Sequence, residues 1–271
     1  MSTFMAGLRS EFTKLLTTRM WWILAIVLFA YIALLSGGLG ALFSAITTGT
    51  IPATGRTPHF GTLAPLVYSF ATSVGYVFPL LLGALASTGE FKHQTLTPTF
   101  LANPRRWQVL ATKSVSSLGI GAVYGAIALV ASVGAGAIAL TVFGVDTALG
   151  DSDTWALIGR SVLAMALWAA IGVGVGVVIP SQVGAIITVL AFTQFVEPLL
   201  RLAASFNDTT ASIGKFLPGA AGDGLVGASI FTMSAPGAAT LDWWQGALVL
   251  LAYAVVLAVL GYFISWRRDV T

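Results

Sequence analysis

Residues 89–113 read GEFKHQTLTPTFLANPRRWQVLATK, and this polar stretch is the starting point for predicting the fold. It holds four of the thirteen Lys and Arg residues of the chain, yet two strongly apolar runs flank it. Charged side chains are costly in hydrocarbon, so a segment of this kind must project from a membrane. Because Lys and Arg are enriched in cytoplasmic loops, we expect the segment to face the cytoplasm.

Composition supports the membrane assignment. The chain has 271 residues, of which 57% are hydrophobic and only 8% are charged. A soluble domain carries about 25% charged residues to solvate its surface, so this chain is predicted to be an all-α polytopic membrane protein. The basic residues flank apolar runs, which excludes a nucleic-acid partner and favours the lipid bilayer. The absence of cysteine excludes disulfides and thiolate metal sites.

Six apolar segments reach the length of about 20 residues that a bilayer-spanning helix needs. They are continuous, unlike the short alternating segments of a membrane β-barrel. The whole chain, 1–271, is therefore predicted to form a single transmembrane domain. Since only five residues separate the fourth and fifth segments, we expect these two to be antiparallel neighbours. The predicted spans lie near 21–43, 63–87, 116–143, 155–178, 184–204 and 243–265.

The orientation follows from the basic residues, because positive charge is enriched on the cytoplasmic side. With both termini cytoplasmic, nine of the thirteen lie inside: Arg9, Lys14, Arg19, Lys92, Arg105, Arg106, Lys113, Arg267 and Arg268. The outer ends and loops then hold only Arg56, Arg160, Arg201 and Lys215. We therefore expect a multi-pass protein of the plasma membrane with both ends inside.

Two segments outside the spans are semi-apolar. In residues 2–18, apolar side chains from Phe4 to Leu16 follow a helical period, and Arg9, Glu11 and Lys14 lie largely elsewhere. We interpret this as an amphipathic helix along the inner interface; the alternative is a cytosolic extension of the first span. The external loop 206–242 contains either re-entrant helices or an ordered loop packed on helix ends, and the sequence leaves both open.

Signals of enzymatic chemistry are scarce, so we expect no enzyme activity and no cofactor in this chain. There is no Gly-x-x-x-x-Gly-Lys-Ser/Thr phosphate loop. The two histidines, His59 and His93, are predicted on opposite sides of the membrane, where they cannot share a metal or a catalytic triad. Closely packed helices are indicated by the Gly121-x-x-x-Gly125 and Gly172-x-x-x-Gly176 spacings.

Glu197 and Arg201 stand out because they are charged residues inside a span, four positions apart on one helix face. Pro198 follows Glu197 and should disturb the backbone hydrogen bonds there. The pair is either a polar element facing a translocation path or partner subunit, or a self-neutralising pair near the outer interface. The second interpretation is favoured by the position of Arg201 near the predicted outer end. The other spans offer few ionisable residues, which weakens an ion-driven carrier.

The polar segment 88–113 contains prolines and an asparagine at positions that divide it into short structural elements. Pro98 and the Asn103-Pro104 pair predict a short helix, a turn and then a basic helix start that leads into the third span. Short helices on the cytoplasmic face suit docking into a groove of a soluble partner. A loop that serves only topology would explain the arginines but not this length.

The same segment resembles the loop after the second helix of ABC-2 type permeases. The resemblance lies in EFKHQTL at residues 90–96, TFLANPRR at 99–106 and VLATK at 109–113. In that family an acidic, an aromatic and a basic residue precede Gly-Thr, and a Pro-x-Arg element follows. Gln94 stands where many members carry glycine. The six spans, the amphipathic start and the semi-apolar last external loop also match that architecture.

The resemblance implies the membrane subunit of a bacterial ATP-driven exporter. Two permease copies, identical or related, would pair with two separate ATPase subunits that bind ATP and Mg²⁺. The ATPases would push on the coupling residues Glu90, Phe91, Lys92, His93, Thr95, Phe100, Asn103, Pro104, Arg105 and Arg106. Two alternatives remain: a self-sufficient secondary transporter or channel, and a non-transporting membrane scaffold or sensor component.

Overall fold

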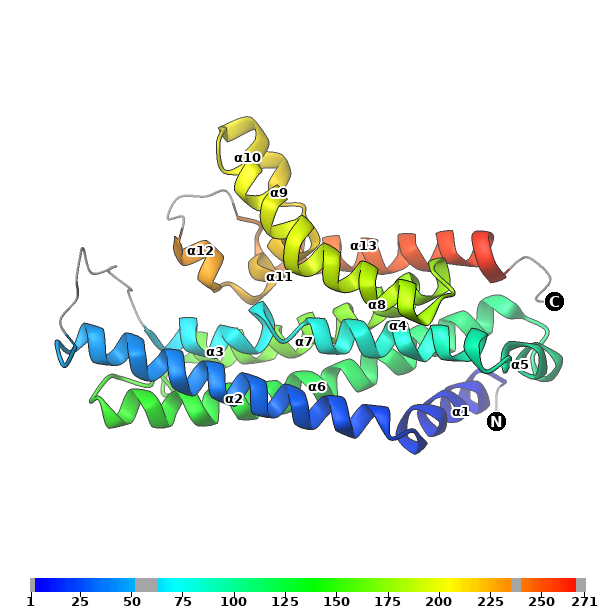
Figure 1. Ribbon diagram of the computed structural model, residues 1–271, viewed down its shortest axis with the longest axis horizontal. Helices are drawn as coiled ribbons and strands as arrows, with labels where there is room; N and C mark the ends of the chain where they lie inside the picture. The colour runs from blue at the N-terminus through cyan, green and yellow to red at the C-terminus, as the bar shows by residue number, and fades with distance from the viewer. Residues whose placement is uncertain (1–2, 52–62, 235–239, 267–271) are drawn as a thin grey trace.

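A computed structural model describes residues 3–51, 63–234 and 240–266, and throughout these ranges the chain forms helices and no strand (Figure 1). Within the described residues, six helical segments are long and apolar enough to cross a membrane, which confirms the predicted all-α fold and is consistent with a multi-pass membrane protein. Four residues used to predict the orientation and the absence of a shared metal site lie outside the described residues: Arg56, His59, Arg267 and Arg268. So do parts of the segments 2–18 and 206–242.

The six segments are Met20–Thr47, Leu63–Lys92, Arg106–Val142, Ser152–Val178, Gln182–Ala204 and Trp243–Trp266. The elements in chain order are α1 (Thr3–Thr17), α2 (Met20–Thr47), α3 (Leu63–Ser73), α4 (Val77–Lys92), α5 (Leu96–Ala102), α6 (Arg106–Val142), α7 (Ser152–Val178), α8 (Gln182–Ala191), η1 (Phe192–Val196), α9 (Glu197–Ala204), α10 (Asp208–Gly214), α11 (Pro218–Val226), α12 (Ile230–Ser234), α13 (Trp243–Gly261) and η2 (Tyr262–Trp266). The second span therefore consists of α3 and α4, and the fifth of α8, η1 and α9.

Helix α7 forms the centre of the bundle and packs against α4, α6 and α13. Glycines permit the close approach. A Cβ on Gly172 would collide with the carbonyl of Leu80, and a Cβ on Gly121 would lie 2.7 Å from the Cβ of Ala169. The small-residue spacings predicted from the sequence are thus helix contacts, as expected for membrane bundles. These glycine contacts hold α7 close to α4 and α6.

The fourth and fifth spans are not the close neighbours that their short connection predicted. Helix α8 makes its main contacts with α4 and few with α7. The chain leaves α7 in an extended conformation at Ile179, with φ −115° and ψ 91°, before Ser181 caps α8. This carries the fifth span away from α7, and the ribbon of α8 and α9 leans outward from the bundle (Figure 1).

Two spans are interrupted, and each interruption precedes a proline. Pro79 lies four residues after Gly75, where the second span breaks between α3 and α4. Pro198 lies four residues after Gln194, inside the π-helical turn η1. Proline has no N–H for the carbonyl four residues earlier and clashes with it, which explains both interruptions. The disturbance at Pro198 was predicted; the break at Gly75 was not.

Helix α1 packs on α6 at the end of the bundle where α5 lies (Figure 1). It is separated from α2 by a turn at residues 18–19, so it is not an extension of the first span. The prediction that Glu11 lies on the polar, solvent-facing side of this helix is wrong, because Glu11 is only 4% exposed. Met5, predicted to lie on the apolar side, is instead 53% exposed. Glu11 faces the bundle because Lys113 of α6 pairs with it there.

The loop 206–242 contains three short helices in its described part. Helix α11 is almost entirely buried against α13, α7 and α3, whereas α10 projects outward beside α9 (Figure 1). Pro218 begins α11 and Gly227, with φ +90°, ends it. A buried helix in this position brings polar residues from the loop into contact with the spans.

Candidate functional site

The segment between α4 and α6 is a folded element, which we call the connecting element (residues 93–105). Helix α4 ends with Thr95 N–H donating to the Glu90 carbonyl at 3.0 Å and Gln94 N–H donating to the Phe91 carbonyl at 3.3 Å. This is the pattern of a Schellman cap, whose turning residue must be left-handed. That residue is Gln94, with φ +54°. A non-glycine residue is strained there by about 1–2 kcal/mol, so the surrounding contacts must hold the turn in place.

Side chains fix the connecting element to the bundle. Leu96 of α5 is completely buried in a cluster with residues of α6 and α7. The ring of Phe100 packs edge-on against Trp266, with centroids 5.4 Å apart. Arg106 donates to the Trp266 carbonyl at 2.6 Å and lies over the Phe100 ring. Helix α5 is therefore clamped between the start of α6 and the end of η2.

The outer surface of the connecting element and of the first turn of α6 is open. Leu101 is 82% exposed and Trp107 is 58% exposed. Lys92, His93 and Arg105, which are near them in the sequence, are exposed as well. The exposed residues thus include two large apolar side chains and several basic ones. That combination is typical of a docking surface for a partner whose groove has an acidic edge.

Beneath this surface lies a buried ionic network of four residues from three helices, which we call the α1–α4–α6 junction. Lys113 Nζ lies 2.6 Å from Glu11 Oε2 and 3.1 Å from Glu90 Oε1. Lys14 Nζ lies 2.6 Å from Glu11 Oε1 and 2.8 Å from Glu90 Oε1. Glu90 and Lys113 are 6% and 3% exposed. Two carboxylates and two ammonium groups make the junction neutral, and it fastens α1 to the base of α4 and α6.

The surroundings of Glu11 and Lys14 hold both groups in the charged form. Burial alone would raise the pKa of Glu11, but Lys113 and Lys14 outweigh it and the pKa lies below its ordinary value. Burial alone would lower the pKa of Lys14, but Glu90 and Glu11 outweigh it and the pKa lies above its ordinary value. Glu11 and Lys14 are therefore ionised across the neutral pH range.

The structure divides the predicted coupling residues into exposed and internal groups. Lys92, His93, Thr95, Pro104 and Arg105 lie on the open surface. Phe91, Phe100, Asn103 and Arg106 are half-buried and hold the shape of the element; the Asn103 side chain accepts from Arg105 N–H at 3.2 Å. Glu90 is only 6% exposed and forms ion pairs with Lys14 and Lys113 in the junction. The exposed pair Leu101 and Trp107 was not singled out in the sequence, although both are large apolar residues in a polar segment.

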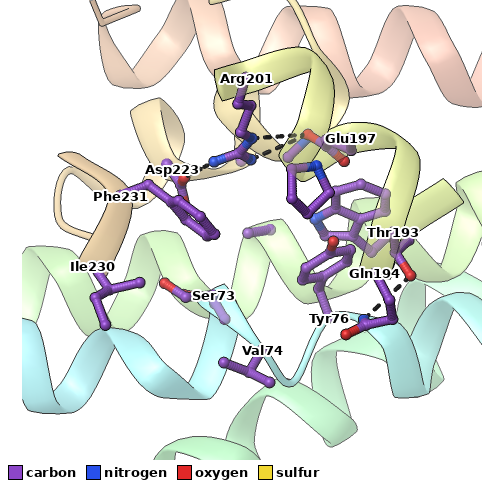
Figure 2. Close-up of a pocket in the computed structure, with 16 residues that line it drawn as sticks. Ser73, Val74, Tyr76, Thr193, Gln194, Glu197, Arg201, Asp223, Ile230 and Phe231 are labelled. Atoms are coloured by element: carbon purple, nitrogen blue, oxygen red, sulfur yellow. Dashed lines mark hydrogen bonds and ion pairs between the residues drawn. The ribbon is translucent and has the colours of Figure 1, made fainter. Parts of the chain in front are cut away.

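A second polar site lies between the two interrupted spans, and we call it the polar cavity (Figure 2). Its volume is about 170 Å³. Tyr76 from the α3–α4 break and Thr193 and Gln194 from η1 face it. Glu197, Arg201 and Asp223 form one side of it, and Phe231 of α12 closes another (Figure 2). Interrupted membrane helices that meet at one point commonly frame ligand sites, because their backbone departs from the regular helix there.

Arg201 connects the charged groups of the cavity. Its guanidinium lies 3.1 Å from Glu197 Oε1 and 2.6 Å from Asp223 Oδ2. Glu197 Oε1 also accepts from Gly219 N–H at the start of α11, at 2.5 Å. Glu197 is 1% exposed and Asp223 is 8% exposed. The predicted Glu197–Arg201 pair is present, but its interpretation as self-neutralising is incomplete because Asp223 adds a second carboxylate.

Asp223 was missed because it lies 22 residues from Arg201, in a loop without helical periodicity of its own. The only sequence signal was an aspartate in a semi-apolar, glycine-rich stretch. Among the described residues no group of three His, Asp or Glu side chains could hold a metal ion. Comparison with models of known protein families and with curated proteins finds no match.

Proposed function

We propose that this chain is the membrane-spanning subunit of an ATP-binding cassette transporter, which exports a substrate with ATP hydrolysed by separate ATPase subunits. The observation that carries the proposal is the connecting element with the start of α6. Its short helix is held by Leu96 and Phe100, whereas Leu101, Trp107 and the basic residues near them in the sequence are exposed. An apolar anchor with a charged rim fits a groove in a soluble partner. ATP and Mg²⁺ would be bound by that partner.

The packing supports a mechanical role for this element. A push on α5 reaches α6 and α7 through Leu96 and reaches η2 through Phe100 and Trp266. The junction carries the same displacement to α1 through Glu11 and Lys113. Tightly packed helices move as rigid bodies, so closure of the ATPases would tilt the bundle rather than deform it. A second copy, or a related permease, would complete the translocation path.

The charge distribution supports a cytoplasmic position for the connecting element. Arg9, Lys14 and Arg19 belong to α1 and the turn after it, and Lys92, Arg105, Arg106 and Lys113 flank α5. Both groups lie at one end of the bundle (Figure 1). By the positive-inside rule this end faces the cytoplasm, which places the N-terminal helix and the end of η2 inside. The proposed location is the plasma membrane of a bacterium.

A self-sufficient carrier is the second candidate, and the polar cavity is the observation that favours it. Glu197 lies where two spans are interrupted, the arrangement found at binding sites of secondary transporters. Such a carrier would transport without nucleotide. A scaffold or sensor component, the third candidate, would bind a partner through the connecting element without ATP-dependent transport.

Co-purification with matched variants tests the proposal. The tagged chain should retain a nucleotide-hydrolysing partner in mild detergent, and Leu101→Glu should lose that partner because a carboxylate replaces the apolar anchor. Ile213→Glu is the control, since Ile213 is 68% exposed on the outward-projecting α10, away from α5. Both variants should reach the membrane in equal amounts. Retention of the same partner by Leu101→Glu, or absence of any ATPase with the unmodified chain, would refute the proposal.

A further inference from the structure

The polar cavity contains more carboxyl groups than basic groups, so it carries excess negative charge when both carboxyl groups are ionised. Glu197 and Asp223 contribute two carboxylates, and Arg201 is the cation that forms ion pairs with both. Gly219 N–H at the start of α11 supplies a helix N-terminus, equivalent to roughly +0.5 of an elementary charge. Lys215 is the next basic residue along the chain, and its ammonium lies over the Phe216 ring at 5.4 Å. The helix end reduces the excess negative charge but does not cancel it.

One carboxylate oxygen is left for a ligand. Glu197 Oε1 accepts from Arg201 and Gly219, whereas Glu197 Oε2 is buried without a hydrogen-bond partner. A buried, unpaired carboxylate oxygen is costly unless a donor or cation reaches it. Glu197 belongs to the lining of the cavity, so its carboxyl group is part of the wall against which a molecule in the cavity would lie.

The remaining lining suits an organic group better than a bare ion. The Tyr76 and Trp168 rings pack with centroids 4.4 Å apart, and both belong to the lining. The volume of about 170 Å³ is close to that of an engineered protein cavity of about 150 Å³ that binds benzene. Aromatic faces also attract ammonium groups. A calcium ion would need roughly 6–8 oxygen ligands, several of them carboxylates, whereas the lining adds to Glu197 Oε2 mainly neutral oxygens such as those of Ser73, Thr193 and Gln194.

We propose that the polar cavity binds a small organic monocation of about the size of benzene. Its ammonium group donates to Glu197 Oε2, and its apolar part lies against Tyr76 and Trp168. Bound there, the cation neutralises the excess carboxylate and satisfies the unpaired oxygen at the same time. The site belongs to a single chain, so this inference is independent of the ATP-driven transport proposed above.

Two probes of equal size test the charge requirement: cyclopentylammonium and its neutral analogue cyclopentanol. Binding to the purified full chain is measured by calorimetry without nucleotide. Cyclopentylammonium should bind at least about tenfold more tightly than cyclopentanol, because a hydrogen bond between an ammonium group and a carboxylate is stronger than one from a neutral hydroxyl group. Glu197→Gln keeps an oxygen for Gly219 and Arg201 but removes the charge, so it should abolish the preference. Asp153→Asn, which changes an exposed carboxylate at the start of α7, should preserve it.

Equal affinity for the two probes would overturn the proposal, because it would mean that a proton rather than a cation neutralises the cavity. A preference that persists in Glu197→Gln would place the site elsewhere. Failure of both probes to bind would also overturn it. Unchanged tryptophan fluorescence and chromatographic behaviour of Glu197→Gln would show that the variant is folded. ATPase association measured on the same variant separates this result from the proposed function.

Discussion

Replacing Lys113 by methionine should destabilise the protein, because it leaves the α1–α4–α6 junction with a buried excess of negative charge. Lys113 is 3% exposed and lies within 2.6 and 3.1 Å of Glu11 and Glu90. Removing one partner of a buried ion pair costs about 3–5 kcal/mol. Lys14 remains and contacts both carboxylates. We therefore expect the lower end, a loss of about 3 kcal/mol in the free energy of unfolding.

A second substitution restores the charge balance and tests the reasoning. With Glu11→Gln added, the remaining Lys14–Glu90 pair at 2.8 Å is neutral as a unit. Replacing a buried ion pair by uncharged groups is often nearly neutral, so the double variant should regain about 2 kcal/mol or more relative to Lys113→Met alone. Lys92→Met is the control, since Lys92 is exposed at the end of α4, next to the connecting element.

The measurement is denaturant unfolding in detergent micelles, followed by the fluorescence of the eight tryptophans. The reasoning is refuted if Lys113→Met behaves like Lys92→Met. It is equally refuted if the losses from Lys113→Met and Glu11→Gln simply add, because additive losses indicate that the two side chains do not interact.

Three further predictions concern the same end of the molecule. The pKa of Glu11 is lowered and that of Lys14 is raised, so the stability that each contributes should be complete near neutral pH. The free energy of unfolding should decrease at pH values below about 4.5, where Glu11 becomes protonated, and at pH values above about 10.5, where Lys14 loses its proton. Unfolding measurements that show unchanged stability at both pH extremes would contradict this prediction. Gln94→Gly should raise the free energy of unfolding by about 1 kcal/mol, because glycine adopts the left-handed conformation without strain. If denaturant unfolding shows that the variant is equally or less stable, the Schellman cap at the end of α4 is contradicted. Gly7→Cys combined with Thr112→Cys should form a disulfide on mild oxidation. A Cβ on Gly7 would lie 3.8 Å from the Thr112 Cβ, which is a typical Cβ–Cβ distance in disulfides. Free thiols detected by mass-tagging after oxidation would show that α1 does not dock on α6.

The features that could be predicted from the sequence are those set by local composition. Six apolar runs of sufficient length lead directly to six helices, because a buried backbone must satisfy its own hydrogen bonds. The close packing at Gly121 and Gly172 follows from spacing within one helix. The short helix before the third span follows from Pro98 in its first turn and from Asn103-Pro104 after its end.

The features that escaped prediction depend on pairs of residues distant in the chain. Glu11 looked like part of a solvated face until Lys113, 102 residues later, was placed beside it. The polar cavity required Asp223 to enter from a loop and meet Arg201. Helical periodicity describes which side chains share a face, but it does not say which partner that face meets. Buried charge clusters are assembled by tertiary packing, and a single sequence carries little signal for them.

The measurement that tests the central claim most directly is ATP hydrolysis by the ATPase partner reconstituted with this chain in lipid vesicles. If the connecting element transmits the work of ATP hydrolysis, the unmodified chain and Ile213→Glu should change the hydrolysis rate equally. Leu101→Glu, whose apolar anchor is 82% exposed in the unmodified protein, should leave the rate at that of the ATPase alone. Hydrolysis that responds to Leu101→Glu as it does to the unmodified chain would contradict the account.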